Sequence, residues 1–199
     1  MIHLVRHGET PGNARRFLQY PETPLSERGL EQARRLGERL REHPVARVLC
    51  SDYARAEATG ACIAKATGAP LEHEPLLRER DFGALRGTPY ADLEVDPFAQ
   101  DYAPPDGETW PVFHARVDRA WTRVVAAART GPLVVVTHGL VGYSLATRHL
   151  ALADEDRAAF TGLANTSLTS IEPQAPYRVV RFNCTAHLEE GSAPSGAPA

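Results

Sequence analysis

The stretch Leu4-Val5-Arg6-His7-Gly8-Glu9-Thr10 decides the fold of this 199-residue chain. Together with Ile2 its first residues predict a buried β-strand, because β-branched and apolar residues favour strands. The strand then ends in a cation, an imidazole and a glycine. Open α/β sheets bind their ligands at the carboxyl ends of their strands, so this strand end is a candidate site. A strand end whose Arg and His simply reach solvent has the same short pattern, and the match is weak by itself.

A second strand end repeats the pattern. Residues 132–137 predict the most clearly buried strand of the chain, and His138 and Gly139 follow it directly. Because the carboxyl ends of parallel strands lie at one edge of a sheet, we expect His7 and His138 to face each other across one site. Arg55 follows the end of another predicted strand and is expected at the same edge.

Strands and helices alternate along the chain, which predicts a three-layer α/β/α sandwich with a mostly parallel central sheet. We expect one domain over residues 1–188 and a disordered Gly/Ser/Pro/Ala tail over 189–199. The Pro- and Gly-containing residues 11–24 predict a loop. Residues 84–109 are a long excursion of the kind that forms functional lids. The remaining segments predict strands at 45–50, 166–171 and 177–182, helices at 26–41, 55–67, 110–129 and 140–152, and extended or irregular chain at 71–79.

Composition and charge exclude several classes of partner. A net charge of −3 gives no general attraction for nucleic acid or an anionic membrane. The sequence has no apolar run long enough to span a bilayer and no basic-then-apolar leader, so we expect a cytoplasmic protein. Its three cysteines are odd in number and widely spaced, which argues against a disulfide framework or a cysteine zinc site. The sequence carries no signature of an oligomeric state.

Two imidazoles beside guanidiniums favour an anionic ligand. Adjacent arginines oppose a metal cation, so we expect no metal site, whereas a phosphate group matches the forked donors of arginine. The same cations disfavour protonation of His7 and leave its lone pair available near neutral pH. A neutral imidazole aimed at phosphorus is a nucleophile, and a phosphohistidine intermediate is therefore chemically reasonable.

Several motifs, in order, resemble those of the histidine phosphatase superfamily, the cofactor-dependent phosphoglycerate mutase-like proteins. The resemblance covers nearly the whole chain up to about residue 185 and implies a phosphoglycerate mutase-like fold. It rests on the opening stretch with Asn13, on residues 24–29, on Ser51 with Arg55, on residues 77–83, on residues 105–109 before a helix that carries Arg116, and on residues 134–139.

The resemblance assigns roles to single residues. It implies that His7 becomes phosphorylated and that Arg6, Asn13, Arg55 and His138 hold the phosphoryl oxygens. It places the proton donor at Glu79, with Asp81 as the fallback acid, and the competing interpretation of Glu79 is a surface carboxylate paired with Arg78 or Arg80. Gly139 and Phe82 are further candidates for the phosphate or substrate site. The residues imply no cofactor.

Residues 88–109 bear on the choice of activity. They contain six acidic residues and no Lys or Arg, so they would repel a doubly phosphorylated cofactor. Their aromatic residues predict either an apolar cover over the ligand or simple packing of the lid. We therefore expect a metal-independent phosphomonoester hydrolase that acts on a small phosphorylated metabolite. The alternatives are a phosphoglycerate mutase, a sugar bisphosphatase, or a catalytically silent member that binds a phosphorylated ligand.

Overall fold

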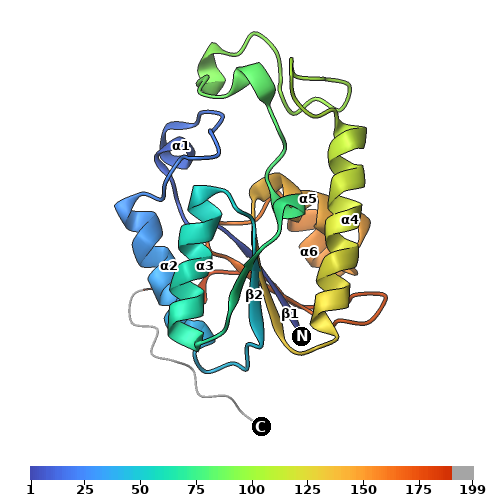
Figure 1. Ribbon diagram of the computed structural model, residues 1–199. Helices are drawn as coiled ribbons and strands as arrows, with labels where there is room; N and C mark the ends of the chain where they lie inside the picture. The colour runs from blue at the N-terminus through green and yellow to red at the C-terminus, as the bar shows by residue number, and fades with distance from the viewer. Residues whose placement is uncertain (190–199) are drawn as a thin grey trace.

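The computed structural model describes residues 1–189 and contains a six-stranded sheet of order β3-β2-β4-β1-β5-β6 (Figure 1). The first four strands in this order are parallel, β5 is antiparallel to β1, and β6 is antiparallel to β5. The mostly parallel sheet predicted from the sequence is thus confirmed. The strands are β1 (Ile2–Arg6), β2 (Arg47–Cys50), β3 (Leu71–His73), β4 (Leu133–Thr137), β5 (Leu168–Ile171) and β6 (Val179–Cys184).

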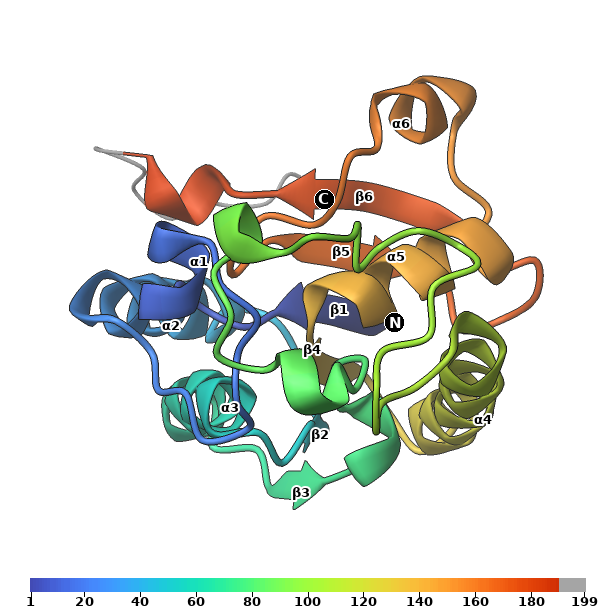
Figure 2. The same ribbon diagram turned by 90° about the horizontal axis from the view of Figure 1, so that it is seen from above.

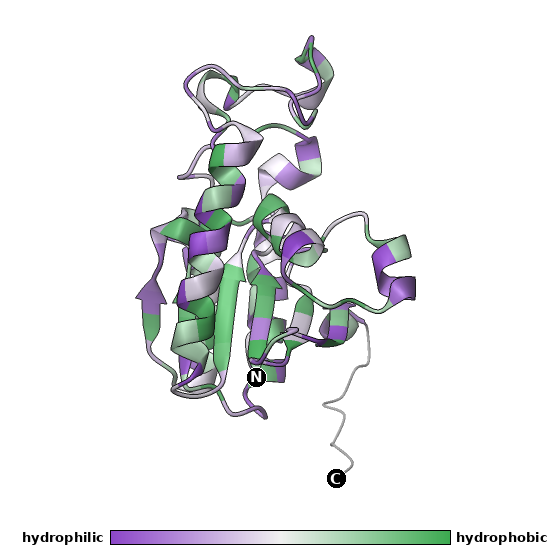
Figure 3. Ribbon diagram, turned by 90° about the vertical axis from the view of Figure 1, so that its right-hand side faces the viewer, coloured by the Kyte–Doolittle hydropathy of each residue, from purple (hydrophilic) through white to green (hydrophobic). Residues whose placement is uncertain are grey.

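Helices cover both faces of the sheet, which gives the expected three layers (Figures 1 and 2). Alternate residues of β4 enter two separate cores. Val134 and Val136 pack with α2 (Glu27–Leu40) and α3 (Ala54–Thr67), whereas Leu133 and Val135 pack with α4 (Trp110–Ala128) and α5 (Gly139–Arg148). This period of two along a strand buried on both faces explains the continuous apolar run in the sequence. Figure 3 shows the central strands as mostly hydrophobic and the helices as mixed.

Short elements account for the differences from the sequence-based assignment. Residues 11–24 are not wholly a loop, because α1 (Pro11–Arg15) forms there. Thr10 accepts a hydrogen bond from the Asn13 backbone and Asn13 returns one, so a capping box stabilises this single turn. The helix expected at 140–152 ends at Arg148, and α6 (Asp154–Ala159) follows as a separate helix. The remaining elements are 3-10 turns, namely η1 (Pro75–Leu77), η2 (Gly83–Leu85), η3 (Tyr90–Asp92) and η4 (Ala186–Leu188).

The 84–109 segment lies over the carboxyl edge of the sheet (Figures 1 and 2). Arg80 anchors it: the guanidinium donates to the carbonyls of Pro97, Tyr102 and Glu108 at 3.0, 2.9 and 3.0 Å. Arg80 is 2% exposed, and its guanidinium lies 4.3 Å from the centre of the Trp110 ring. The segment is therefore packed onto the body of the protein.

Two sequence-based predictions remain outside these observations. Residues 190–199, which make up nearly all of the expected disordered tail, lie outside the described residues. The single catalytic domain over 1–188 stays a prediction. Within residues 1–189 no helix is both long and apolar enough to cross a membrane.

The first turn of α2 lies directly on the backbone that follows β1. Ser26 donates its backbone N–H to the Glu9 carbonyl at 2.9 Å. A Cβ on Gly29 would meet the Glu9 carbonyl oxygen at 2.0 Å, and one on Gly8 would meet the Gly29 carbonyl oxygen at 2.5 Å. Both glycines are thus required by the close approach of two backbones. This approach fixes the loop that carries His7 against α2.

Replacing Gly29 by Ala tests this contact. An alanine normally stabilises a helix relative to glycine by about 1 kcal/mol. Here we expect the free energy of unfolding to fall by about 3 kcal/mol, because the Cβ cannot be accommodated without moving the backbone. Urea denaturation measures the change. Leu30→Ala, at the adjacent 49% exposed position, is the control and should change stability by less than about 0.5 kcal/mol. Equal effects of the two substitutions would contradict the assignment.

Candidate active site

The pairing of β1 with β4 places the two histidines together. The strands are parallel neighbours with Arg6 opposite Thr137, so His7 and His138 leave adjacent strand ends. Their ring centroids lie 5.1 Å apart, and both side chains are buried. His7 and His138, which the sequence predicted to face each other, are therefore neighbours in the structure.

His7 is held in one tautomer. Its Nδ1 lies 2.7 Å from the Gly8 carbonyl oxygen, and because a carbonyl only accepts, the proton is on Nδ1. Nε2 then carries the lone pair and accepts from Nε of Arg55 at 3.3 Å. The pKa of His7 lies well below its ordinary value, first because the ring is buried and then because Arg55 and Arg6 are near. The ring is neutral with Nε2 on the side of the arginine.

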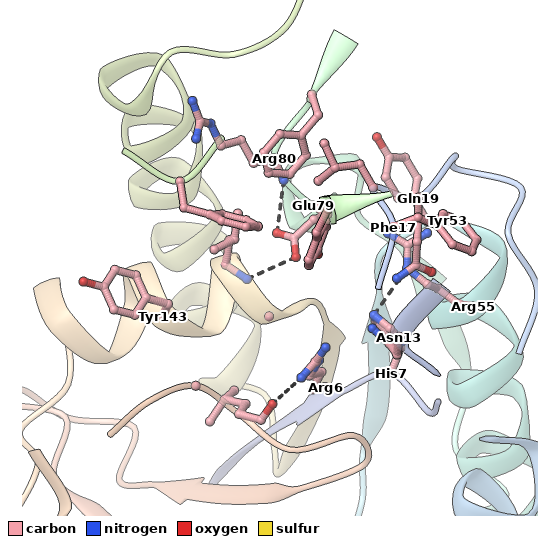
Figure 4. A pocket seen from close by; sticks show the side chains of 18 of the residues that line it. Arg6, His7, Asn13, Phe17, Gln19, Tyr53, Arg55, Glu79, Arg80 and Tyr143 are labelled. Atoms are coloured by element: carbon pink, nitrogen blue, oxygen red, sulfur yellow. Dashed lines mark hydrogen bonds between the residues drawn. The ribbon is translucent and has the colours of Figure 1, made fainter. Parts of the chain in front are cut away.

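Arg6 and Arg55 are held by backbone carbonyls. Arg55, in the first turn of α3, donates through Nη1 to the Tyr20 carbonyl at 3.0 Å, and burial lowers its pKa to about 10. It therefore stays charged at neutral pH. Arg6 donates through Nη1 to the Leu163 carbonyl at 2.5 Å (Figure 4). Neither contact cancels the positive charge, because each acceptor is neutral.

His138 is fully buried beside His7 and is not among the residues that line the cavity between His7 and Glu79. Its Nε2 contacts Oγ of Ser51 at 2.8 Å, and burial, followed by the charge of Arg55, lowers its pKa. Nδ1 of His138 and Nε of Arg6 are both buried and lack a hydrogen-bond partner in the described part of the chain. Nε1 of Trp121 and Oγ of Ser167, neither of which lines the cavity, are the other two such atoms within residues 1–189.

Glu79 faces this group from the opposite side (Figure 4). One carboxylate oxygen accepts the backbone N–H of Arg80 at 3.1 Å, and the other accepts that of Leu140, in the first turn of α5, at 3.1 Å. The surface ion pair considered from the sequence does not form among the described residues, since Arg78 pairs with Asp52 and Arg80 binds carbonyls. The Glu79 carboxylate is thus oriented by two backbone N–H groups.

Asp81, the fallback acid, points elsewhere. Its Oδ1 accepts the backbone N–H of Gly83 at 2.7 Å and pairs with Arg86 at 2.9 Å. It does not line the cavity in which Glu79 lies. A separation of two residues along the chain therefore puts the two carboxylates in different surroundings.

Arg116 holds the segment that contains Glu79. From α4 its guanidinium donates to the carbonyls of Leu76, Arg78 and Glu79 at 2.8, 2.7 and 3.2 Å. It also pairs with Glu108 at 2.6 Å. The place of Glu79 thus depends on α4 as well as on α5.

A cavity of about 240 Å³ lies between His7, at the carboxyl end of β1, and Glu79 (Figure 4). Six residues singled out by motif or resemblance line it with His7: Arg6, Asn13, Arg55, Glu79, Phe82 and Gly139. Its remaining wall is largely apolar; the aromatic residues of the 84–109 segment were expected as an apolar cover or as packing of that segment, and the others were not foreseen. That wall includes Phe17, Leu18, Tyr53, Tyr90, Phe98, Leu140, Tyr143 and Leu163.

Sequence reasoning missed the loop between α6 and β5. Leu163 binds Arg6 through its carbonyl, and Asn165 donates to the His7 carbonyl at 2.9 Å. The sequence predicts no element for residues 161–165 and a strand from residue 166, so no local pattern marks this loop. No group of three or more His, Cys, Asp or Glu side chains within residues 1–189 is arranged to hold a metal ion.

The chain is similar to known proteins over most of its length. The family model described as histidine phosphatase superfamily (branch 1) matches residues 2–185. An adenosylcobalamin/alpha-ribazole phosphatase of Salmonella typhimurium is 34% identical over 69% of this chain and 73% of its own. A probable phosphoglycerate mutase GpmB of Salmonella arizonae is 32% identical over 70% and 69%. The structure titled Bacillus stearothermophilus YhfR has a TM-score of 0.82 and 28% identity over 94% of this chain and 98% of that one.

The protonation state of His7 is directly testable. Because its pKa is lowered from 6.5, the ring should remain the neutral Nδ1–H tautomer at the pH where an ordinary imidazole is half protonated. Long-range ¹H–¹⁵N NMR spectra distinguish this tautomer from an imidazolium, and His7→Gln assigns the signal. A doubly protonated His7 ring at about pH 6.5 would contradict the burial argument.

Proposed function

We propose that this chain, which belongs to the histidine phosphatase superfamily (branch 1), is a metal-independent phosphomonoester hydrolase that acts through a phosphohistidine. The observation that carries the proposal is the state of His7. A neutral imidazole with its Nε2 lone pair beside two buried guanidiniums is a nucleophile placed where a phosphate dianion binds.

In the first step Nε2 of His7 attacks phosphorus. An N–P bond forms as the ester P–O bond breaks, and the Glu79 carboxyl gives its proton to the leaving alcohol oxygen. Arg6, Arg55, Asn13 and His138 supply donors to the equatorial oxygens, whose charge they stabilise in the transition state. Arg6, Arg55 and Asn13 line the cavity, which supports these assignments, whereas the role of His138 rests on the family resemblance.

In the second step a water attacks the phosphohistidine from the side that the alcohol has left. The Glu79 carboxylate takes a proton from that water as the N–P bond breaks. Inorganic phosphate and neutral His7 are released, and Glu79 is protonated for the next turnover. One carboxyl group in the cavity serves both proton transfers because alcohol and water occupy the same position in turn.

The charges around the cavity favour a substrate with a single phosphate. Four arginines line it: Arg6 and Arg55 lie beside His7, Arg86 is paired with Asp81, and Arg80 donates to three backbone carbonyls. The covering residues 88–109 contain six acidic residues and no Lys or Arg. Their charge would repel the second phosphate of a mutase cofactor or a bisphosphate substrate.

The apolar wall supports the same substrate class. Phe17, Tyr90 and Phe98 line the cavity together with His7 and Glu79, and they could contact an apolar alcohol group. The volume of about 240 Å³ suits a small ligand. We propose that Phe82 and Gly139 also line this substrate site, as the sequence suggested.

Hydrolysis of p-nitrophenyl phosphate in the presence of EDTA tests the proposed reaction. We expect turnover to survive chelation and to fall at least about a thousand-fold in His7→Ala. Quenching during turnover should trap an acid-labile phosphoryl adduct that His7→Ala lacks. A requirement for added metal would refute the proposal. So would phosphoglycerate mutase activity that needs a bisphosphate primer and proceeds with negligible hydrolysis.

The role of Glu79 predicts a dependence on the leaving group. Glu79→Gln should slow alkyl phosphates by about 10² to 10⁴, because an alkoxide leaves only when protonated. It should slow p-nitrophenyl phosphate far less. The ratio of kcat/KM for the two substrates measures the effect. Asp81→Asn, two residues away and outside the cavity, is the matched control and should leave the ratio unchanged; equal losses in Glu79→Gln would exclude the acid role.

A further inference from the structure

Asn165, from a distant part of the chain, contacts both His7 and Asn13. These two belong to the phosphate cradle, which consists of Arg6, His7, Asn13 and Arg55. Its Nδ2 donates to the His7 carbonyl at 2.9 Å and to Oδ1 of Asn13 at 3.2 Å. Asn165 is itself half-buried in the loop before β5 and does not line the cavity. It therefore touches the nucleophile's backbone and a cradle side chain without reaching the substrate position.

The orientation of both amides follows from their partners. The His7 carbonyl can only accept, so the nitrogen of the Asn165 amide must face it. The second N–H of that nitrogen then points at Asn13, which must offer its oxygen. The backbone N–H of Thr10 donates to the same oxygen at 3.3 Å, so two independent donors select Oδ1.

This arrangement decides what Asn13 offers to a ligand. With Oδ1 engaged on the protein side, Nδ2 and its two N–H groups remain, and Asn13 lines the cavity. A phosphoryl oxygen needs donors, whereas the flipped amide would present an oxygen and repel it. The identity of the atom that Asn13 presents is thus set by its neighbours.

Thr10 alone holds the Asn13 amide weakly. Its hydroxyl lies 3.0 Å from Oδ1 of Asn13 but 2.8 Å from Oε1 of Gln19, and it has one proton to donate. The backbone N–H of Thr10 makes a long contact with the amide oxygen. Loss of Asn165 would remove a donor from Oδ1 and free the Asn13 amide to rotate.

We propose that Asn165 is a positioning residue: it holds the Asn13 amide with Nδ2 toward the substrate phosphoryl group. The role rests on the proposed function of the site. Asn165 acts through Asn13, so removing it has a consequence only while Asn13 is present.

A double-mutant cycle on vanadate inhibition of p-nitrophenyl phosphate hydrolysis tests the coupling. Losing a hydrogen bond of this kind weakens binding by about 5- to 30-fold, and we expect this loss in Asn165→Ala. In an Asn13→Ala background the same substitution should change vanadate affinity by less than about twofold. Asn165→Asp, which keeps the volume but offers acceptors, provides the same comparison should the alanine variant fold poorly.

Asn183 provides the matched control. Asn183, in β6, binds the same loop away from His7 and Asn13. Its side chain donates to the Gly162 carbonyl at 3.1 Å and accepts from the Ala164 N–H at 2.9 Å. Asn183→Ala should leave vanadate affinity within about twofold of wild type. If Asn183→Ala lowers vanadate affinity as much as Asn165→Ala does, the role of Asn165 is structural and the proposal is overturned. The same holds if Asn165→Ala lowers vanadate affinity by its full factor in the Asn13→Ala background.

The wild-type protein separates this proposal from the one on which it rests. A wild type that hydrolyses phosphate esters and binds vanadate, with Asn165→Ala unchanged, overturns the positioning role alone. A wild type that neither hydrolyses nor binds vanadate overturns the proposed function, and the positioning role with it. Loss in Asn165→Ala that disappears without Asn13 supports both.

Discussion

The parallel pairing of β1 with β4 is the constraint on which the site depends. It sets His7 and His138 side by side at the centre of the sheet, where both rings are buried between two layers of helices. Burial is the first cause of their lowered pKa values, and the arginines add to it. A strand end at the edge of the sheet would expose the rings and allow protonation near neutral pH. The central position thus keeps His7 neutral, and the arginines reinforce that state rather than create it.

Backbone carbonyls, rather than carboxylates, hold the buried arginines around the cavity. Leu163 and Tyr20 supply carbonyls to Arg6 and Arg55, and Arg80 is bound by three more. A carbonyl dipole satisfies the donors of a guanidinium without neutralising its charge. The cost of burying Arg6 and Arg55 is thereby reduced while their positive charge remains available. A carboxylate in either place would have competed with a phosphate dianion for the same cation.

The sequence predicts those parts of the structure that local patterns determine. Two apolar strands ending in His-Gly place His7 and His138, and the alternation of elements gives the three layers. The short helix α1 was not predicted, because Pro11 and Gly12 indicate a loop. In the structure they are its first two residues, and the capping box stabilises the turn. Glu79 was separated from Asp81 only by resemblance, since nothing local shows that Asp81 turns to Arg86. Asn165 could not be found, because its contacts with the cradle arise only when the final strands return to the sheet.

The site consists of two parts with different supports. The edge of the sheet and the loop at residues 161–166 hold Arg6, His7 and Asn13. Glu79 is held mainly from the covering part: Arg116 binds its carbonyl, and the backbone N–H of Arg80, whose side chain anchors the 84–109 segment, binds one carboxylate oxygen, while Leu140 of α5 binds the other. Changes in the covering segment can therefore alter the cavity wall and Glu79 together without moving His7. Under the proposed function, such a division would let one phosphate site serve alcohols of different shape, because that site would contact only the group that all of them share.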